Sequence, residues 1–421
     1  MNFYFVGKNA YFCTIFNECS TKATLLAIRW LKTQSQRLID MRAIDKFLKK
    51  VVLGSDRRVR DFCEKKPSRL RFYENKYMPL QLSFFRWHNY AIGDHVLGAL
   101  RKSTEKYIRI NLSPEQMADV KYTSKLRDDI IKCHLIYKTH PTEYFLYGYE
   151  HLDYWQRKEY LSDSDRWRIL HERFGKKVHR EHADKWFFYH LAQPYFHREA
   201  CKVGEEAKKE DFLRFVSRHH DFFVKPLDGC FGRNAYRLEA DSEEKAEEIY
   251  QKLVSNGVWI VEELITQSEE FAAWNASSVN TVRIASFLTA EGVHHNIVPF
   301  FRAGRVGSVV DNALSGGIIA GVDEKTGVLC SDGMDEEGRH FNAHPDSGIV
   351  FEGWQVPDWQ ELCRLTEEIH RSLPPYHRYI AFDFAHTAKG WVLVEGNWGQ
   401  LIFNQSGCHR GVRKEFLNYI K

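Results

Sequence analysis

The chain has 421 residues, enough for two or three domains that each bury a sizeable core. Hydrophobic residues make up 43% of the chain and aromatic residues 14%, which indicates a globular protein. The formal net charge is only +4, and no basic patch interleaved with stacking aromatic residues stands out, so we expect no nucleic-acid partner.

The nine cysteines are spread singly along the chain, without a CxxC pair. This pattern is typical of reduced thiols in a cytoplasm. No run of eighteen apolar residues is present, and the first residues lack the basic, apolar and small-residue order of a signal peptide. We therefore expect a soluble, cytoplasmic protein.

Residues 1–155 are predicted to form a mainly helical N-terminal region. Residues 24–52 carry apolar side chains at helical spacing, and basic residues outnumber acidic ones from 29 to 71. Such a stretch can make peripheral contact with an anionic membrane surface, although a solvated helix face is the commoner explanation. Further helix starts are predicted at Ser113-Pro114 and at Ser162.

From about residue 176 the pattern changes to short strands separated by glycines. Lys185 stands at the start of a predicted helix, and the apolar strand 222–225 delivers Lys225 at its end. The following loop contains Gly229 and Gly232, so its backbone N–H groups can turn toward one anion beside the lysine. This combination favours phosphate binding, although most such loops are ordinary turns.

The next predicted strands end in, or contain, polar residues. The buried strand 258–261 runs into Glu262, where a strand end can present backbone groups to an adenine edge or can be a plain strand exit. Arg283 lies among apolar neighbours in a later strand, so it must be exposed on one face or paired with an anion. A glycine-containing loop with Asn312 and Ser315 precedes another strand, and it either approaches a ligand or makes a simple turn.

Residues 379–399 are predicted to form two strands joined by a tight turn that ends at Gly390. Side chains alternate along a strand, so Glu395 and Asn397 share one face of the second strand. If the loop has three residues and Gly390 is left-handed, Asp383 of the first strand falls directly across from Glu395.

Two carboxylates and an amide oxygen would then share one face of this hairpin, with Val392 and Val394 turned toward the core. Like charges this close repel unless a cation lies between them, and hard oxygen ligands without Cys or His favour Mg²⁺. The alternative interpretation is a solvated hairpin face.

The order of these pieces resembles the ATP-grasp superfamily: a helix-start lysine, a strand lysine before a glycine loop, a strand ending in Val-Glu-Glu, a strand arginine, and a closing Asp followed by Glu-x-Asn. Within it, SSVNTVRI, GSVVDNALSGGI, HPDSGIVFEG and FDFA…VLVEGN resemble the sugar-transfer-associated branch, also described as alpha-L-glutamate ligase-related. The resemblance covers about Ser162 to the C-terminus and does not explain residues 1–110. It implies an α+β ATP-grasp domain over residues 156–421, with a small lobe at about 180–260 and a metal- and acceptor-binding lobe at 261–421.

The resemblance also implies roles for single residues. The ATP-binding set would comprise Lys185, Lys225, Gly229 and Gly232 at the phosphates, the backbone of Glu262 and Ile265 at adenine, and Glu269 at the ribose. Arg283 and Lys225 would act on the transferring phosphoryl group, Asp383, Glu395 and Asn397 would hold Mg²⁺, and Arg302, Asn312 and Ser315 would face the acceptor.

The implied activity is that of an ATP-dependent carboxylate-amine ligase that works through an acyl phosphate and releases ADP. The branch's association with glycan synthesis suggests a small-molecule or glycan-linked carboxylate, an amine, and a role in cell-surface polysaccharide biosynthesis or modification. Two alternatives stay open: a phosphotransferase of the same fold acting on a hydroxyl, and a nucleotide-binding module within a complex of glycan-assembly enzymes.

Overall fold

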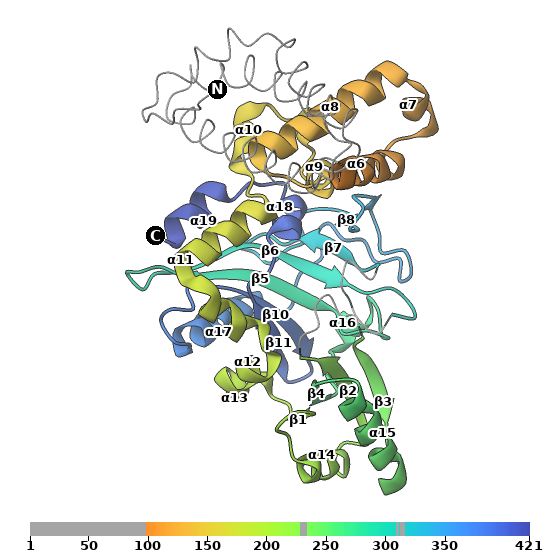
Figure 1. Ribbon diagram of the computed structural model, residues 1–421, viewed down its shortest axis with the longest axis vertical. Coiled ribbons are helices and arrows are strands. Elements are labelled where there is room, and N and C mark those ends of the chain that lie inside the picture. The colour runs from red at the N-terminus through yellow and green to blue at the C-terminus, as the bar shows by residue number, and fades with distance from the viewer. Residues whose placement is uncertain (1–97, 228–233, 309–310, 312–315) are drawn as a thin grey trace, which may run out of the picture. The chain divides into compact units, whose positions relative to one another are not determined.

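The computed structural model describes residues 98–227, 234–308, 311 and 316–421. The predicted helix at 24–52, the basic stretch at 29–71, and the loop residues Gly229, Gly232, Asn312 and Ser315 lie outside the described residues. The described part is an α+β structure with two antiparallel sheets (Figure 1).

The smaller sheet has four strands in the order β1-β4-β2-β3. Its strands are β1 (Ala200–Val203), β2 (Asp221–Pro226), β3 (Tyr236–Glu239) and β4 (Trp259–Glu263). Alternation along β2 buries Phe222 and Val224 against helices α14 (Lys209–Val216) and α15 (Glu243–Ser255), and leaves Lys225 on the other face. The predicted strands at 222–225 and 258–261 are confirmed, with small shifts of their ends.

The larger sheet has seven strands in the order β11-β10-β5-β6-β7-β8-β9. Its strands are β5 (Thr281–Leu288), β6 (His294–Ala303), β7 (Ile318–Gly321), β8 (Gly333–Met334), β9 (His340–Phe341), β10 (Tyr379–Thr387) and β11 (Gly390–Asn397). One face packs against α17 (Trp359–Ser372) and α16 (Glu269–Ala272), using apolar residues such as Val282, Ile284 and Phe382. Arg283 lies between Val282 and Ile284 and therefore points to the opposite face, as its sequence context predicts.

Two groups of helices cover that opposite face. One comprises α11 (Asp163–Ala183) and α19 (Arg413–Tyr419), which pack on Phe287 and Tyr379. The other comprises α6 (Gly98–Asn111), α8 (Val120–Tyr137) and α9 (Pro141–Leu146), whose apolar residues join Phe300 and Ile319 in one core. The remaining helices are α7 (Pro114–Ala118), the 3₁₀ turn η2 (Tyr149–His151), α10 (Tyr154–Glu159), α12 (Lys185–Leu191), α13 (Gln193–Phe196) and α18 (Ile402–Gly407).

The helix starts predicted from sequence are confirmed. Ser113 caps α7 with a reciprocal capping box to Gln116, and Ser162 caps α11 through Asp165. Asp184 caps α12, so that Lys185 is its first residue. Among the described helices, none combines the length and the hydropathy of a membrane-spanning segment.

Residues 100–421 form one compact unit. The predicted boundary near residue 155 falls inside this unit, because the helices between 98 and 146 share a core with β6 and β7. The division into domains beyond this stays a prediction.

Candidate active site

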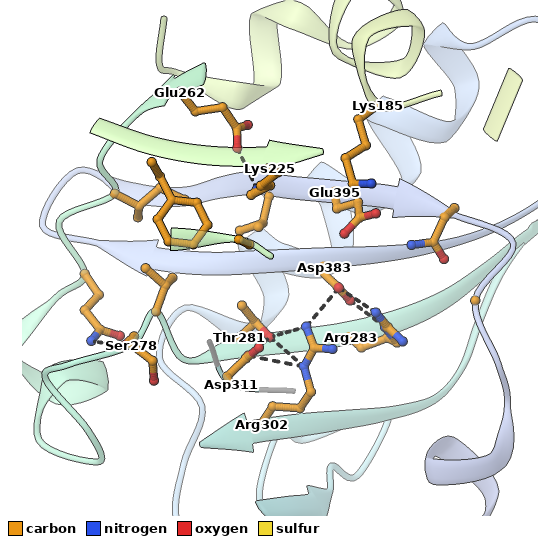
Figure 2. Close-up of a pocket in the computed structure, with 18 of the residues that line it drawn as sticks. Lys185, Lys225, Glu262, Ser278, Thr281, Arg283, Arg302, Asp311, Asp383 and Glu395 are labelled. Atoms are coloured by element: carbon orange, nitrogen blue, oxygen red, sulfur yellow. Dashed lines mark hydrogen bonds and ion pairs between the residues drawn. The ribbon is translucent and has the colours of Figure 1, made fainter. Parts of the chain in front are cut away.

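A cavity of about 920 Å³ lies between the two sheets and is lined by residues of both. Nine predicted site residues line it: Lys185, Lys225, Glu262, Ile265, Arg283, Arg302, Asp383, Glu395 and Asn397. Figure 2 shows Lys185 and Lys225 on one side, Arg283 and Asp383 on the other, and Glu395 between them. The fold thus brings together side chains from a stretch of more than 200 residues.

The hairpin of β10 and β11 has the predicted pair but not the predicted loop. Asp383 lies opposite Glu395, whereas Thr387 pairs with Gly390, so the loop has two residues instead of three. The registers are reconciled by a bulge at Val394, which is the extra residue between the pairs on either side. Without the bulge, a two-residue loop would place Glu395 opposite Phe382, on the face that packs into the core.

The core face of β11 differs from the prediction. Leu393 pairs with Phe384 and both lie in the main hydrophobic core, together with Trp391. Val394 instead lines the cavity, so the prediction that it faces the core is wrong. Gly390 has the expected positive φ, at 102°.

Asp383 is held by two arginines from neighbouring strands. Arg283 of β5 donates from Nε to Oδ1 at 2.5 Å and from Nη2 to Oδ2 at 2.6 Å, and Arg302 of β6 donates from Nη2 to Oδ2 at 2.8 Å. The carboxylate is only 3% exposed. Burial would raise the pKa of Asp383, but the two guanidinium groups outweigh it and hold that pKa below its ordinary value.

A second buried carboxylate, Asp311, completes this cluster. Arg302 Nε lies 3.2 Å from Asp311 Oδ2 and 2.9 Å from Thr281 Oγ1, and the Thr281 hydroxyl donates to Asp311. Burial raises the pKa of Asp311, while Arg302 acts in the opposite direction. Two arginines and two aspartates therefore balance each other on the cavity wall.

Glu395 and Asn397 supply the other predicted metal ligands and are half-buried on the cavity wall. Burial acts to lower the pKa of Arg283, but the carboxylates of Asp383 and Glu395 together raise it above its ordinary value. Glu395 is therefore close enough to Arg283 for the two charges to attract. Carboxylate and amide oxygens fit Mg²⁺ chemically. Both carboxylate oxygens of Asp383 accept hydrogen bonds from arginines, so a cation would have to compete with these arginines. Among the described residues, no three His, Cys, Asp or Glu side chains form a metal-binding group.

On the side of the smaller sheet, Lys225 is paired with Glu262. Lys225 Nζ lies 2.6 Å from Glu262 Oε2, and Arg198 Nη2 donates to Glu262 Oε1 at 2.7 Å. Burial would raise the pKa of Glu262, which is 3% exposed, but the two cations lower it to about 2. Glu262 therefore contributes a buried, ionised side chain to the site.

Lys185 is positioned by the close packing of α12 on β11. A side chain at Gly396 would bring its Cβ within 2.2 Å of the Phe188 ring, so glycine permits the helix to lie this close. Lys185 Nζ donates to the carbonyls of Pro226 and Leu227, at 3.2 and 3.3 Å. These are the last described residues before the glycine loop, so Lys185 lies beside the place where that loop begins.

The predicted nucleotide contacts after β4 are placed differently from one another. Glu262 pairs with Ala200 on one side and Phe223 on the other, so its backbone lies within the sheet, and its adenine contact stays a prediction. Ile265 lies past the strand end and lines the cavity. Glu269 is the exposed first residue of α16, and its ribose contact stays a prediction.

Sequence reasoning did not single out Asp311, Arg198 or Thr281 as site residues. Asp311 lies in the loop predicted to approach a ligand, next to the predicted acceptor residue Asn312. Arg198 stands in no recognisable motif, and its partner Glu262 is 64 residues away. These contacts join side chains that are 30 and 64 residues apart, so no local pattern shows them.

Two antiparallel sheets therefore enclose the cavity, with Lys185 and Lys225 beside the smaller sheet and Asp383 and Glu395 on the larger one. The chain belongs to the sugar-transfer associated ATP-grasp family, whose model matches residues 183–419. The resemblance seen in the sequence is thereby confirmed. The matched region begins at the last residue of α11 (Asp163–Ala183), later than the start near Ser162 that the sequence suggested.

Solved structures offer distant likenesses. The ATP-grasp ligase PsnB complexed with a minimal precursor is 11% identical, with 68% of each chain covered and a TM-score of 0.33. D-cycloserine synthetase DcsG is 15% identical, with 67% of this chain and 82% of that chain covered and a TM-score of 0.35. D-alanine–D-alanine ligase from Bacillus anthracis is 8% identical, with 57% and 64% covered and a TM-score of 0.32, so the chain spans less than two thirds of that enzyme. No curated protein matches the chain. At these scores the likenesses carry no functional conclusion, and the family match stands by itself.

Proposed function

We propose that this protein is an ATP-dependent ligase that joins a carboxylate to an amine through an acyl phosphate. The observation that carries the proposal is the convergence of Lys185, Lys225, Arg283, Asp383 and Glu395 on one cavity. Phosphoryl transfer needs positive charge around the phosphates and little covalent help from the protein, and this cavity offers that charge. The membership of the ATP-grasp family supports the same reading.

The nucleotide would lie along the edge of the smaller sheet. Ile265, beyond the end of β4, would meet adenine through its backbone, and Lys185 and Lys225 would bind the phosphates with the glycine loop. Lys185 is the first residue of α12, and Lys225 is the second-last residue of β2. The backbone of these elements therefore fixes the Cα positions of both lysines. Glu269, the exposed first residue of α16, would bind the ribose.

Asp383, Glu395 and Asn397 would hold Mg²⁺ at the phosphates, where it would offset negative charge on the phosphoryl oxygens. The residues fit this role by the chemistry of their oxygen atoms and by their common position on the cavity wall. Arg283, now paired with Asp383, would bind the transferring phosphoryl group of ATP. Arg302 would keep Asp311 as a partner and would face the acceptor.

In the reaction, a carboxylate oxygen of the substrate attacks the γ-phosphorus of ATP, and ADP leaves. The amine nitrogen then attacks the acyl carbon and gives up a proton to the leaving phosphate, the C–O bond to phosphate breaks, and the amide remains. Arg283 and Lys225 stabilise charge on the oxygens during the first step. No protein nucleophile takes part.

The substrates we propose are a sugar acid or another glycan-linked carboxylate and a small amine, in cell-surface polysaccharide biosynthesis or modification. The family's description as sugar-transfer associated supports the sugar. The cavity is also lined by Trp167 and His179 of α11 and by Trp398, which directly follows Asn397. A wall of aromatic and imidazole rings suits a hydroxylated ring better than a second highly charged group. We place the acceptor there, in a protein that works in the cytoplasm.

The test is ADP release by purified protein with panels of uronic acids and amino acids, followed by product analysis. A ligase makes ADP only when a carboxylate is present, and amide formation needs an amine. Phosphate found on a hydroxyl would identify the phosphotransferase instead. Nucleotide binding without turnover on any carboxylate would favour a binding module.

A further inference from the structure

Arg198 connects the two sheets at the candidate site. It stands between α13 and β1, and its guanidinium donates to the carbonyls of Leu393 at 2.6 Å and Val394 at 3.1 Å on β11. The same group donates to Glu262 on β4 at 2.7 Å. Arg198 therefore binds the bulge that orients Glu395 and also the carboxylate that pairs with Lys225 (Figure 2 shows the Glu262–Lys225 pair).

Glu262 has two cationic partners, and a nucleotide would compete for only one of them. Lys225 is bonded to Glu262 Oε2, and Arg198 to Oε1. A buried carboxylate that loses its last partner is strongly destabilised. Since Arg198 is fixed by backbone carbonyls and is itself 7% exposed, it remains with Glu262 when Lys225 leaves.

We propose that Arg198 is a positioning residue that makes Lys225 available to nucleotide phosphates by keeping Glu262 paired. The inference rests on the proposed function, because it takes Lys225 as a phosphate ligand. It goes further in assigning a role to a residue that belongs to no motif of the sequence. Arg198 acts through Glu262 and Lys225 and does not touch the phosphates itself.

The charge of Glu262 is therefore the reason that Arg198 is needed. Without Arg198, Lys225 is the remaining partner of a buried carboxylate, and a phosphate can gain Lys225 only by leaving Glu262 unpaired. If Glu262 is also made neutral, that obstacle disappears. The role of Arg198 can thus be separated from simple structural support by removing both charges together.

The experiment compares ADP and adenosine binding by calorimetry for the wild type, Arg198→Gln, Glu262→Gln and the double variant. We expect Arg198→Gln to weaken ADP binding by about tenfold or more while adenosine binding changes by less than about twofold. The double variant should regain ADP affinity to within about threefold of the wild type. Arg214→Gln, which removes an exposed arginine paired with Asp211 on α14 of the same lobe, is the matched control and should bind as the wild type does.

Equal loss of ADP and adenosine affinity in Arg198→Gln, or no recovery in the double variant, would overturn the proposal, because either result indicates general loosening. If Arg198→Gln does not fold, Arg198→Lys keeps the charge, and it should bind ADP within about threefold of the wild type while the double variant reports on the charge pair. A wild type that binds neither ADP nor adenosine would remove the proposed function itself, and the role of Arg198 with it.

Discussion

Asp383 and Glu395 lie directly opposite each other on β10 and β11, yet only Asp383 is bound by arginines from the neighbouring strands. The extra residue Val394 creates this pair by shifting the register of the hairpin. Because of that shift both carboxylates line the cavity, and Arg283 sits in the field of both. The site is therefore a charge-balanced wall in which an incoming nucleotide and cation would rearrange existing ion pairs.

The pair of Asp383 with its arginines should matter strongly for stability. Replacing Asp383 with Asn removes the carboxylate that Arg283 pairs with, while Arg302 keeps Asp311, and we expect the free energy of unfolding to fall by about 3–5 kcal/mol in urea denaturation. Asp221→Asn is the matched control, since Asp221 makes a similar two-bonded contact with Arg237 on the surface. That variant should lose no more than about 1 kcal/mol. If both variants lose a similar free energy of unfolding, the buried position of Asp383 does not make its ion pairs more important for stability than a surface pair.

Glu262 should make stability depend on acid pH. Its pKa is lowered to about 2 in the folded protein from an ordinary value of 4.5, so its stabilising contribution is present above pH 4.5 and is lost as the pH falls toward 2. The linkage corresponds to about 3 kcal/mol in order of magnitude. Urea denaturation at pH 6 and pH 3 should therefore show a smaller loss of stability on acidification in Glu262→Gln than in the wild type. Parallel losses in the two proteins would contradict the assignment.

The lysines should control nucleotide affinity one by one. We expect Lys185→Met and Lys225→Met each to weaken ADP binding by about tenfold or more, because each removes a point charge from the phosphates. Lys202→Met is the control, since Lys202 lies on β1 of the same sheet but not on the described cavity wall. Isothermal titration of the three variants checks this. Full ADP affinity in Lys225→Met would mean that this lysine serves Glu262 alone.

Gly396 should be intolerant of a side chain. An alanine there would meet the Phe188 ring, so α12 must move away from β11 or the ring must rotate in a packed core. We expect Gly396→Ala to lower the free energy of unfolding by about 1–3 kcal/mol and to weaken ADP binding through displacement of Lys185. Phe188→Leu in the same chain should recover part of both losses. Additive effects of the two substitutions would argue against the contact as the cause.

Local patterns of the sequence predicted much of the fold. The alternation around Arg283 gave its direction because strand periodicity depends on adjacent residues alone. The capping residues Ser113 and Ser162 gave helix starts for the same reason. Nine of the residues predicted from the family motifs line one cavity, and the roles assigned to them stay a proposal.

The remainder depends on contacts between segments distant in the sequence. The bulge at Val394 places Leu393 and Phe384 in the core that helices from other parts of the chain complete, and the hairpin sequence alone does not distinguish it from a three-residue loop. The pairing of Arg198 with Glu262 depends on how β1 and β4 align, which no local pattern encodes. The ribose role of Glu269 rests on spacing alone and stays a prediction for this exposed residue at the start of α16.

The central claim is that oxygen ligands at the end of the β10–β11 hairpin bind the cation of a nucleotide. Glu395 tests it more cleanly than Asp383, because Glu395→Gln leaves the bonds of Arg283 and Arg302 to Asp383 in place. The measurement is ADP affinity with Mg²⁺ and with a chelator, for the wild type and Glu395→Gln. We predict that Mg²⁺ tightens ADP binding in the wild type, and that Glu395→Gln loses about tenfold or more of that gain while keeping its metal-free affinity. A variant that binds ADP with Mg²⁺ as tightly as the wild type would contradict the account.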